Sequence, residues 1–98
     1  MKIEWTKVAL KNIKKIHAFY KKTANKGVAD KIIEPIFGRA QDLKNQSNIG
    51  QQEESLKHLK LGHRYLIVGH NKIVYIQKED AIYITHIFDT RQNPSKLK

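Results

Sequence analysis

Residues 64–94 read RYLIVGHNKIVYIQKEDAIYITHIFDTRQNP, and this stretch decides the fold. It holds three short apolar runs that are rich in β-branched and aromatic residues, a composition that suits β-strands. These runs are residues 65–68, 73–76 and 81–88. The turn-forming residues between them, 69–71 and 78–80, are too few for a parallel crossover, which needs about a dozen residues. The stretch therefore predicts a three-stranded antiparallel meander.

The chain before residue 64 predicts one short strand and two amphipathic helices. Residues 3–5 are extended in character, and Thr6 after them is a suitable helix N-cap. Two sets of apolar residues then recur at helical spacing. The first set is Ala9, Ile13, Ile16 and Tyr20, and the second is Ala29, Ile32, Ile33, Ile36, Phe37, Ala40 and Leu43. The turn at residues 23–27 is short enough to make the two helices an antiparallel hairpin.

Pro35 lies inside the second helical pattern, where a proline removes a backbone hydrogen bond and clashes with the preceding turn. We therefore expect either a kink near residues 31–35 or a helix that begins at Pro35. Together the patterns predict an α+β fold with an N-terminal strand, an α-helical hairpin and a three-stranded antiparallel meander, with the helices packed on one face of the sheet. The first strand is expected beside the last strand or at the sheet edge.

The last strand is expected to divide its side chains between the two faces of the sheet, because neighbours along a strand point to opposite sides. On this alternation one face carries Ile82, Ile84, His86 and Phe88, and the other carries Tyr83, Thr85, Ile87 and Asp89. Two helices can cover only one face. The opposite face is therefore expected to be solvated or to hold a partner.

Length and composition limit the classes of protein to consider. With 98 residues the chain predicts a single domain over residues 1–98. It has no cysteine, which excludes disulfides and thiolate metal sites. It has neither an apolar run near the roughly 20 residues that span a bilayer nor a signal-peptide core. We therefore expect a soluble, cytoplasmic protein with no membrane partner.

The formal net charge of +10 is the strongest indication of a partner. A magnitude of about 2–8 is enough to keep a small domain soluble. By charge alone, the candidate partners are nucleic acid, an acidic protein or a membrane surface. Arg64, Lys72 and Arg91 lie at strand ends or just beyond, and we expect them to point into a shared concavity on the open face. Arg91 follows the last strand directly, in a turn, where rigid scaffolds often place working residues.

Two further residues of the meander have both a functional and a structural interpretation. His86 would suit a general base near neutral pH, but its phase with apolar neighbours favours a half-buried structural histidine. Tyr75 could bind a target or pack under the helices, and packing is favoured because aromatic residues at strand spacing are usually core. The remaining histidines show no ligand spacing, so we expect neither a metal site nor a cofactor.

The order strand, helix, helix and three strands, together with the basic charge, resembles the RelE/ParE superfamily of type II toxins over nearly the whole chain. The residues that carry the resemblance, closest to ParE-like members, are IEWT at 3–6 with Ala9 and Leu10, RYLIVG at 64–69, KIVY at 72–75, and the strand and arginine at 84–91. The resemblance implies a small toxin that inhibits bacterial growth and that a cognate antitoxin holds inactive.

Three functions follow as alternatives. The ParE-like layout implies a non-enzymatic toxin that binds DNA gyrase, with Arg64, Lys72, Tyr75 and Arg91 as target-binding residues. The alternative is a RelE-like ribosome-dependent mRNA endonuclease, with Lys72, Arg91 and His86 as catalytic residues around the scissile phosphate. The position of the RelE catalytic tyrosine falls near Leu97, which cannot transfer a proton. The third is a basic nucleic-acid-binding module without toxicity, because fold does not fix function.

Both toxin functions imply a small antitoxin as partner, besides gyrase or the ribosome and its mRNA. Such partners commonly lay a helix or a strand across a groove or a sheet edge. The antitoxin is expected to be acidic where it contacts the chain, to match the excess of Lys and Arg. The pair is expected to assemble into a toxin–antitoxin hetero-oligomer.

Overall fold

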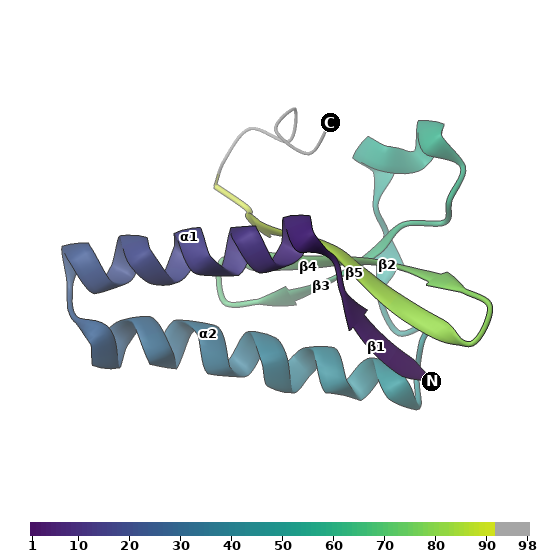
Figure 1. Cartoon of the computed structure of the whole chain (residues 1–98). Helices are drawn as coiled ribbons and strands as arrows, with labels where there is room; N and C mark the ends of the chain where they lie inside the picture. The colour runs from purple at the N-terminus through teal and green to yellow at the C-terminus, as the bar shows by residue number, and fades with distance from the viewer. Residues whose placement is uncertain (92–98) are drawn as a thin grey trace.

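The computed structural model describes residues 1–91 (Figure 1). The main elements are β1 (Lys2–Trp5), α1 (Lys7–Thr23), α2 (Lys26–Gln41), β2 (Gln51–Gln52), β3 (Arg64–Val68), β4 (Asn71–Lys78) and β5 (Ala81–Asp89), with 3₁₀ turns η1 (Asp42–Lys44) and η2 (Glu54–Leu59). The predicted α+β architecture is confirmed, with the helical hairpin along one side of a single sheet (Figure 1).

The sheet has five strands in the order β1-β5-β4-β3-β2. Strand β1 pairs in parallel with β5, so the first strand lies both beside the last strand and at the edge. The meander is antiparallel, and each of its hairpins closes over two residues, since Val68 pairs with Asn71 and Lys78 with Ala81. Strand β2 was not predicted, because its two residues are both glutamine in a segment of turn-like composition.

Local capping sets where both helices begin. The Thr6 hydroxyl accepts a hydrogen bond from the Ala9 amide at 3.2 Å and donates to the Ile84 carbonyl at 2.8 Å, which ties the start of α1 to β5. The Asn25 side chain accepts from the Val28 amide at 2.9 Å and starts α2. Helix α2 then continues through Pro35 to Gln41, so the prediction that the helix begins at Pro35 is wrong. The cap at Asn25 and buried residues on both sides of the proline keep the helix continuous.

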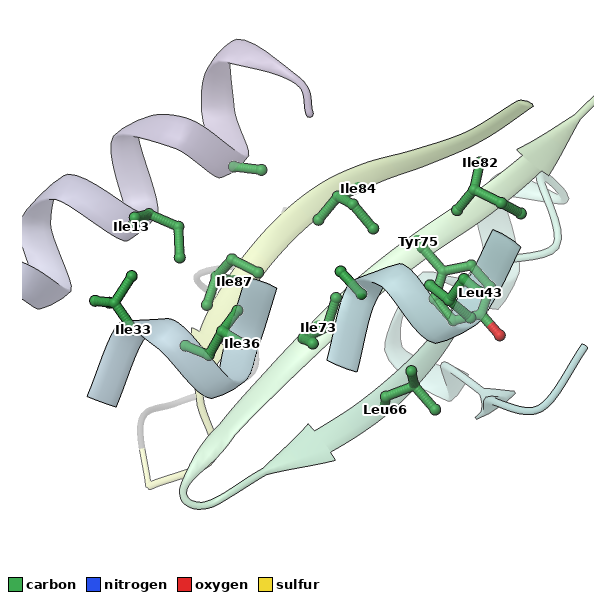
Figure 2. Packing of buried hydrophobic residues seen from close by; sticks show 12 residues of the cluster. Ile13, Ile33, Ile36, Leu43, Leu66, Ile73, Tyr75, Ile82, Ile84 and Ile87 are labelled. Carbon is green, nitrogen blue, oxygen red and sulfur yellow. The ribbon is translucent and has the colours of Figure 1, made fainter. Parts of the chain in front are cut away.

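The main core fills the space between the helices and the face of the sheet that they cover, here called the inner face (Figure 2). Its buried members are Ala9, Ile13, Ile33, Ile36, Ala40, Leu43, Leu66, Ile73, Tyr75, Ile82, Ile84 and Ile87. Trp5 on β1 packs against Phe37 on α2, with ring centroids 4.7 Å apart. Among residues 1–91, no helix combines the length and the hydropathy that crossing a bilayer requires.

A β-bulge between β4 and β5 changes which side chains reach the core. Val74 pairs with His86 and the next residue, Tyr75, pairs with Ile84, so Thr85 has no residue opposite it. β5 thus has one residue more than β4 at this point. Beyond the bulge, the residues of β5 that point to each face of the sheet are therefore exchanged relative to simple alternation. Ile87 consequently joins Ile82 and Ile84 on the inner face, whereas Phe88 and His86 lie on the other face. The predicted division of side chains is therefore wrong after Ile84.

Asn12 of α1 provides a hydrogen-bond acceptor for the backbone of β5 beyond the last residue that pairs with β1. Its side-chain oxygen accepts a hydrogen bond from the Ile87 amide at 3.0 Å. Replacing Asn12 with alanine leaves this partly buried N–H unpaired and is expected to lower the free energy of unfolding by about 1–2 kcal/mol. Urea denaturation measures the effect. Asn12→Asp, which keeps the acceptor, and Lys11→Ala on the exposed side of α1 serve as controls, and equal midpoints for all variants would contradict the prediction.

Candidate functional site

The face of the sheet turned away from the helices, here called the outer face, is only partly open. The segment at residues 53–63 folds over it, and Leu56 packs there with Val74 and Phe88 in a second, smaller core. Tyr65 packs against this cluster from β3. The expectation that the whole face would be free is therefore wrong, because Leu56 is buried against the apolar side chains on this face.

Lys72 lies on the outer face but is already paired. Its Nζ contacts Glu53 Oε1 at 2.6 Å, and Glu53 is only 4% exposed. The same ammonium lies 4.3 Å from the centroid of the Tyr65 ring, a cation–π arrangement. The charge of Lys72 therefore holds the 53–63 segment against the sheet.

Arg64 and Tyr75 are cross-strand partners on the inner face, and both organise the loop before β2. The Tyr75 hydroxyl donates to the Ser47 carbonyl and accepts from the Gly50 amide, each at 2.9 Å. Arg64 donates to the Gly50 carbonyl at 2.8 Å. Tyr75 is 1% exposed, and burial raises the pKa of its phenol. The packing interpretation of Tyr75 is thus the observed one, and the residue has no exposed surface for a target.

Arg91 lies at the far end of β5, beside α1. Its guanidinium donates to both carboxylate oxygens of Asp89, at 3.0 and 2.8 Å, and to the Tyr20 hydroxyl at 3.3 Å. The hydrogen bonds from Arg91 lower the pKa of the Asp89 carboxyl. These residues line a hollow of about 310 Å³ together with Lys15 and the exposed Phe19.

A second hollow of about 220 Å³ adjoins the first, and Tyr20 and Asn71 line both. Its other walls include Lys31 and Pro35 of α2 and the turn between β3 and β4. We call the two hollows together the end groove. Its lining carries the cations Lys15, Lys31 and Arg91 and a single carboxylate, Asp89. The groove can therefore accept an acidic group beside apolar walls.

The expected concavity shared by Arg64, Lys72 and Arg91 is wrong. Arg64 points to the inner face, Lys72 to the outer face, and Arg91 to the end groove. Cross-strand pairing explains why Arg64 and Lys72 point to opposite faces. Arg64 lies opposite Tyr75, which is on the inner face, whereas Lys72 lies opposite Phe88, which is on the outer face.

The three residues expected to be catalytic in an endonuclease, Lys72, His86 and Arg91, do not lie together. His86 shares the outer face with Lys72, but its Nδ1 lies 3.0 Å from the Thr85 hydroxyl and Arg91 lies elsewhere. Residues 1–91 thus do not bring Lys72, His86 and Arg91 into one site, and Leu97 lies outside the described residues. Sequence reasoning missed Tyr20 as a partner of Arg91 and assigned Glu53 to Arg64 as a possible partner rather than to Lys72, since nothing in the spacing marks either pair.

His63, at the end of the 53–63 segment, and His86 on β5 make stability depend on pH. Burial lowers the pKa of His63, and burial followed by the nearby His63 lowers the pKa of His86, both from 6.5. These two imidazoles therefore bind protons less readily in the folded protein than in the unfolded chain. Stability should be fully present above about pH 6.5 and should fall as the pH drops from there toward 5.

Urea unfolding at pH 7.5 and pH 5.0 measures this dependence. His86→Gln should reduce the difference between the two midpoints, whereas the exposed His58→Gln should leave it unchanged. Asp30 and Asp89 have pKa values lowered from 3.8 and so titrate below this window. Equal midpoints for the unsubstituted chain at both pH values would contradict the prediction.

Comparison with known proteins identifies the class to which this fold belongs. The sequence profile described as the ParE toxin of the type II toxin–antitoxin system parDE matches residues 3–94. The chain therefore belongs to the ParE toxin family, and the predicted resemblance to the RelE/ParE superfamily is confirmed. No curated protein sequence matches it.

A solved structure shares the same fold. The chain is similar to a protein of the "Chromosomal ParDE TA system from P. aeruginosa", with a TM-score of 0.77 and 22% sequence identity. The match covers 91% of this chain and 95% of that chain.

Proposed function

We propose that the chain is the toxin of a type II toxin–antitoxin pair and arrests bacterial growth by binding DNA gyrase in the cytoplasm. The observation that supports this most is the match to the ParE toxin family over residues 3–94. The separation of Lys72, His86 and Arg91 supports binding rather than RNA cleavage, because a cleavage site needs proton transfer and phosphate stabilisation at one place.

The exposed cations are the proposed contacts with the target. The Arg91 side chain is 57% exposed although it is paired with Asp89, and Arg64 is exposed at the start of β3. The formal net charge of +10 favours an acidic partner. The cognate antitoxin is accordingly proposed to be acidic over its contact surface and to neutralise the toxin within a hetero-oligomer.

A supercoiling assay with purified gyrase tests the proposal. The chain should inhibit supercoiling, and its antitoxin should restore it. Arg91→Ala should weaken inhibition, whereas Lys22→Ala, at the exposed end of α1, should not. Unaffected supercoiling at high excess, together with codon-phased cuts in translated mRNA, would instead support the ribosome-dependent endonuclease. Harmless overproduction in a bacterium would remove both toxin functions.

A further inference from the structure

The edge of β3 that faces away from β4 is paired with another strand over only part of its length. Strand β2 pairs with Arg64 and Tyr65 alone. At Gly50 the preceding chain turns away, and the amide of Ile49 donates to the Gln46 carbonyl at 3.3 Å instead of continuing along β3. Within residues 1–91, no strand therefore pairs with residues 66–68 on this side.

The geometry of the hairpin shows which backbone groups are left at this edge. Val68 and Asn71 enclose a two-residue turn, so they form a hydrogen-bonded pair. Such pairs alternate along an antiparallel ladder, and Leu66 therefore also bonds to β4. Tyr65 and Ile67 direct their N–H and C=O groups the other way. The N–H and C=O of Tyr65 face β2. The N–H and C=O of Ile67 point in the same direction but lie beyond the end of β2, where no strand pairs with them among residues 1–91.

Both sides of this edge offer a surface for side chains of an added strand. On the outer face, Ile67 is 50% exposed. On the inner side, the 220 Å³ hollow of the end groove has apolar walls at Ile32, Pro35 and Val68. Because side chains alternate along a strand, an extended segment at this edge would contact Ile67 with one set and the hollow with the other.

The charges around the hollow indicate which kind of added strand would bind there. Lys31 lines the hollow and forms no ion pair with any residue between 1 and 91. No carboxylate lines this hollow. The opposite edge, at β1, differs because its hollow mixes Lys2 and Lys44 with Glu4 and Asp80. The β3 edge is thus the one that selects for acidic residues.

We propose that residues 66–68 of β3 receive an extended acidic segment of the cognate antitoxin, which joins the sheet as a short strand beyond the end of β2. The inference rests on the proposed function, since it assigns the site of the antitoxin. Backbone hydrogen bonds to Ile67 supply affinity, and Lys31 and the apolar hollow supply specificity.

Hydrogen exchange on the full chain tests the proposal, alone and with the acidic protein encoded beside its gene. The Ile67 amide should exchange rapidly in the free chain and at least about tenfold more slowly in the complex. Ile67→Pro removes the N–H that points away from β4 and should weaken binding roughly tenfold. Lys31→Glu should weaken it roughly threefold to tenfold. Ile67→Thr and Lys22→Glu are the matched controls, and a circular dichroism melt verifies that each variant is folded.

The outcomes separate this inference from the proposed function. If the complex forms but the Ile67 amide is not protected and Lys31→Glu binds like the unsubstituted chain, the edge proposal is overturned and the toxin proposal stands. Protection at Ile3 and Trp5 would place the added strand on β1 and also overturn it. Concentration-dependent protection of Ile67 in the free chain would assign the edge to a second copy. If no complex forms and growth arrest is absent, both proposals fail.

Discussion

Replacing Gly50 with alanine is expected to lower the free energy of unfolding by about 3 kcal/mol. A Cβ at this buried glycine would lie 2.5 Å from the Tyr75 hydroxyl oxygen and 2.7 Å from the Tyr65 backbone carbonyl. The strand cannot move without breaking its ladder, and Tyr75 cannot move without losing its hydrogen bonds to residues 47 and 50. For a domain of this size the loss corresponds to a fall in Tm of roughly 12–24 °C.

Gly38 provides the matched control for this substitution. It lies in α2, and a Cβ there would meet nothing within 4 Å. Gly38→Ala is therefore expected to stabilise the protein by about 0.5–1 kcal/mol. Tyr75→Phe should cost about 1–3 kcal/mol, because it leaves the buried Gly50 amide without its partner. A Gly50→Ala melt that coincides with that of the unsubstituted chain would show that the loop before β2 is not fixed as described.

Replacing Lys72 with methionine is expected to cost about 3 kcal/mol, because it leaves the carboxylate of Glu53 buried without a partner. The double variant Lys72→Met/Glu53→Gln should recover most of the loss, since a neutral amide needs no counter-charge. Chemical denaturation of both single variants and the double variant forms a thermodynamic cycle for the pair. Additive losses would show that the two side chains do not interact.

The same cycle separates the structural and functional roles of Lys72. The double variant lacks the ammonium but should remain folded, so its effect on growth reports a contact with the target alone. Full growth arrest by the double variant would assign Lys72 to stability. Loss of arrest in a folded double variant would support its proposed place in target binding.

The sequence predicts the parts of this fold that local patterns determine. Alternating apolar residues and short turns specify the meander, and Thr6 marks the start of α1 before any tertiary contact is considered. The bulge opposite Val74 could not be predicted, because it depends on the register between β4 and β5. That single step moved Ile87 into the core and Phe88 to the outer face, against simple alternation.

The candidate site was harder to predict than the fold, because it depends on pairing between distant segments. The basic residues of the meander were recognised, and Asp89 lies only two residues from Arg91, but two other partners lie far away in sequence. Glu53 reaches Lys72 over 19 residues, and Tyr20 reaches Arg91 over 71. Charge alone indicates that a cation needs an anion. Only the three-dimensional arrangement shows that the Lys72 ammonium has a buried carboxylate partner and that the Arg91 guanidinium also reaches the Tyr20 hydroxyl.

The parallel pairing of β1 with β5 has a consequence for synthesis of the protein. The hydroxyl of Thr6 bonds to the carbonyl of Ile84, 78 residues later. A nascent chain therefore carries its first strand unpaired until almost all the rest has been translated, and contacts of such long sequence separation form slowly. The finished sheet, and any activity that requires it, appears only after this delay, which gives a co-translated partner time to meet the polypeptide before it matures.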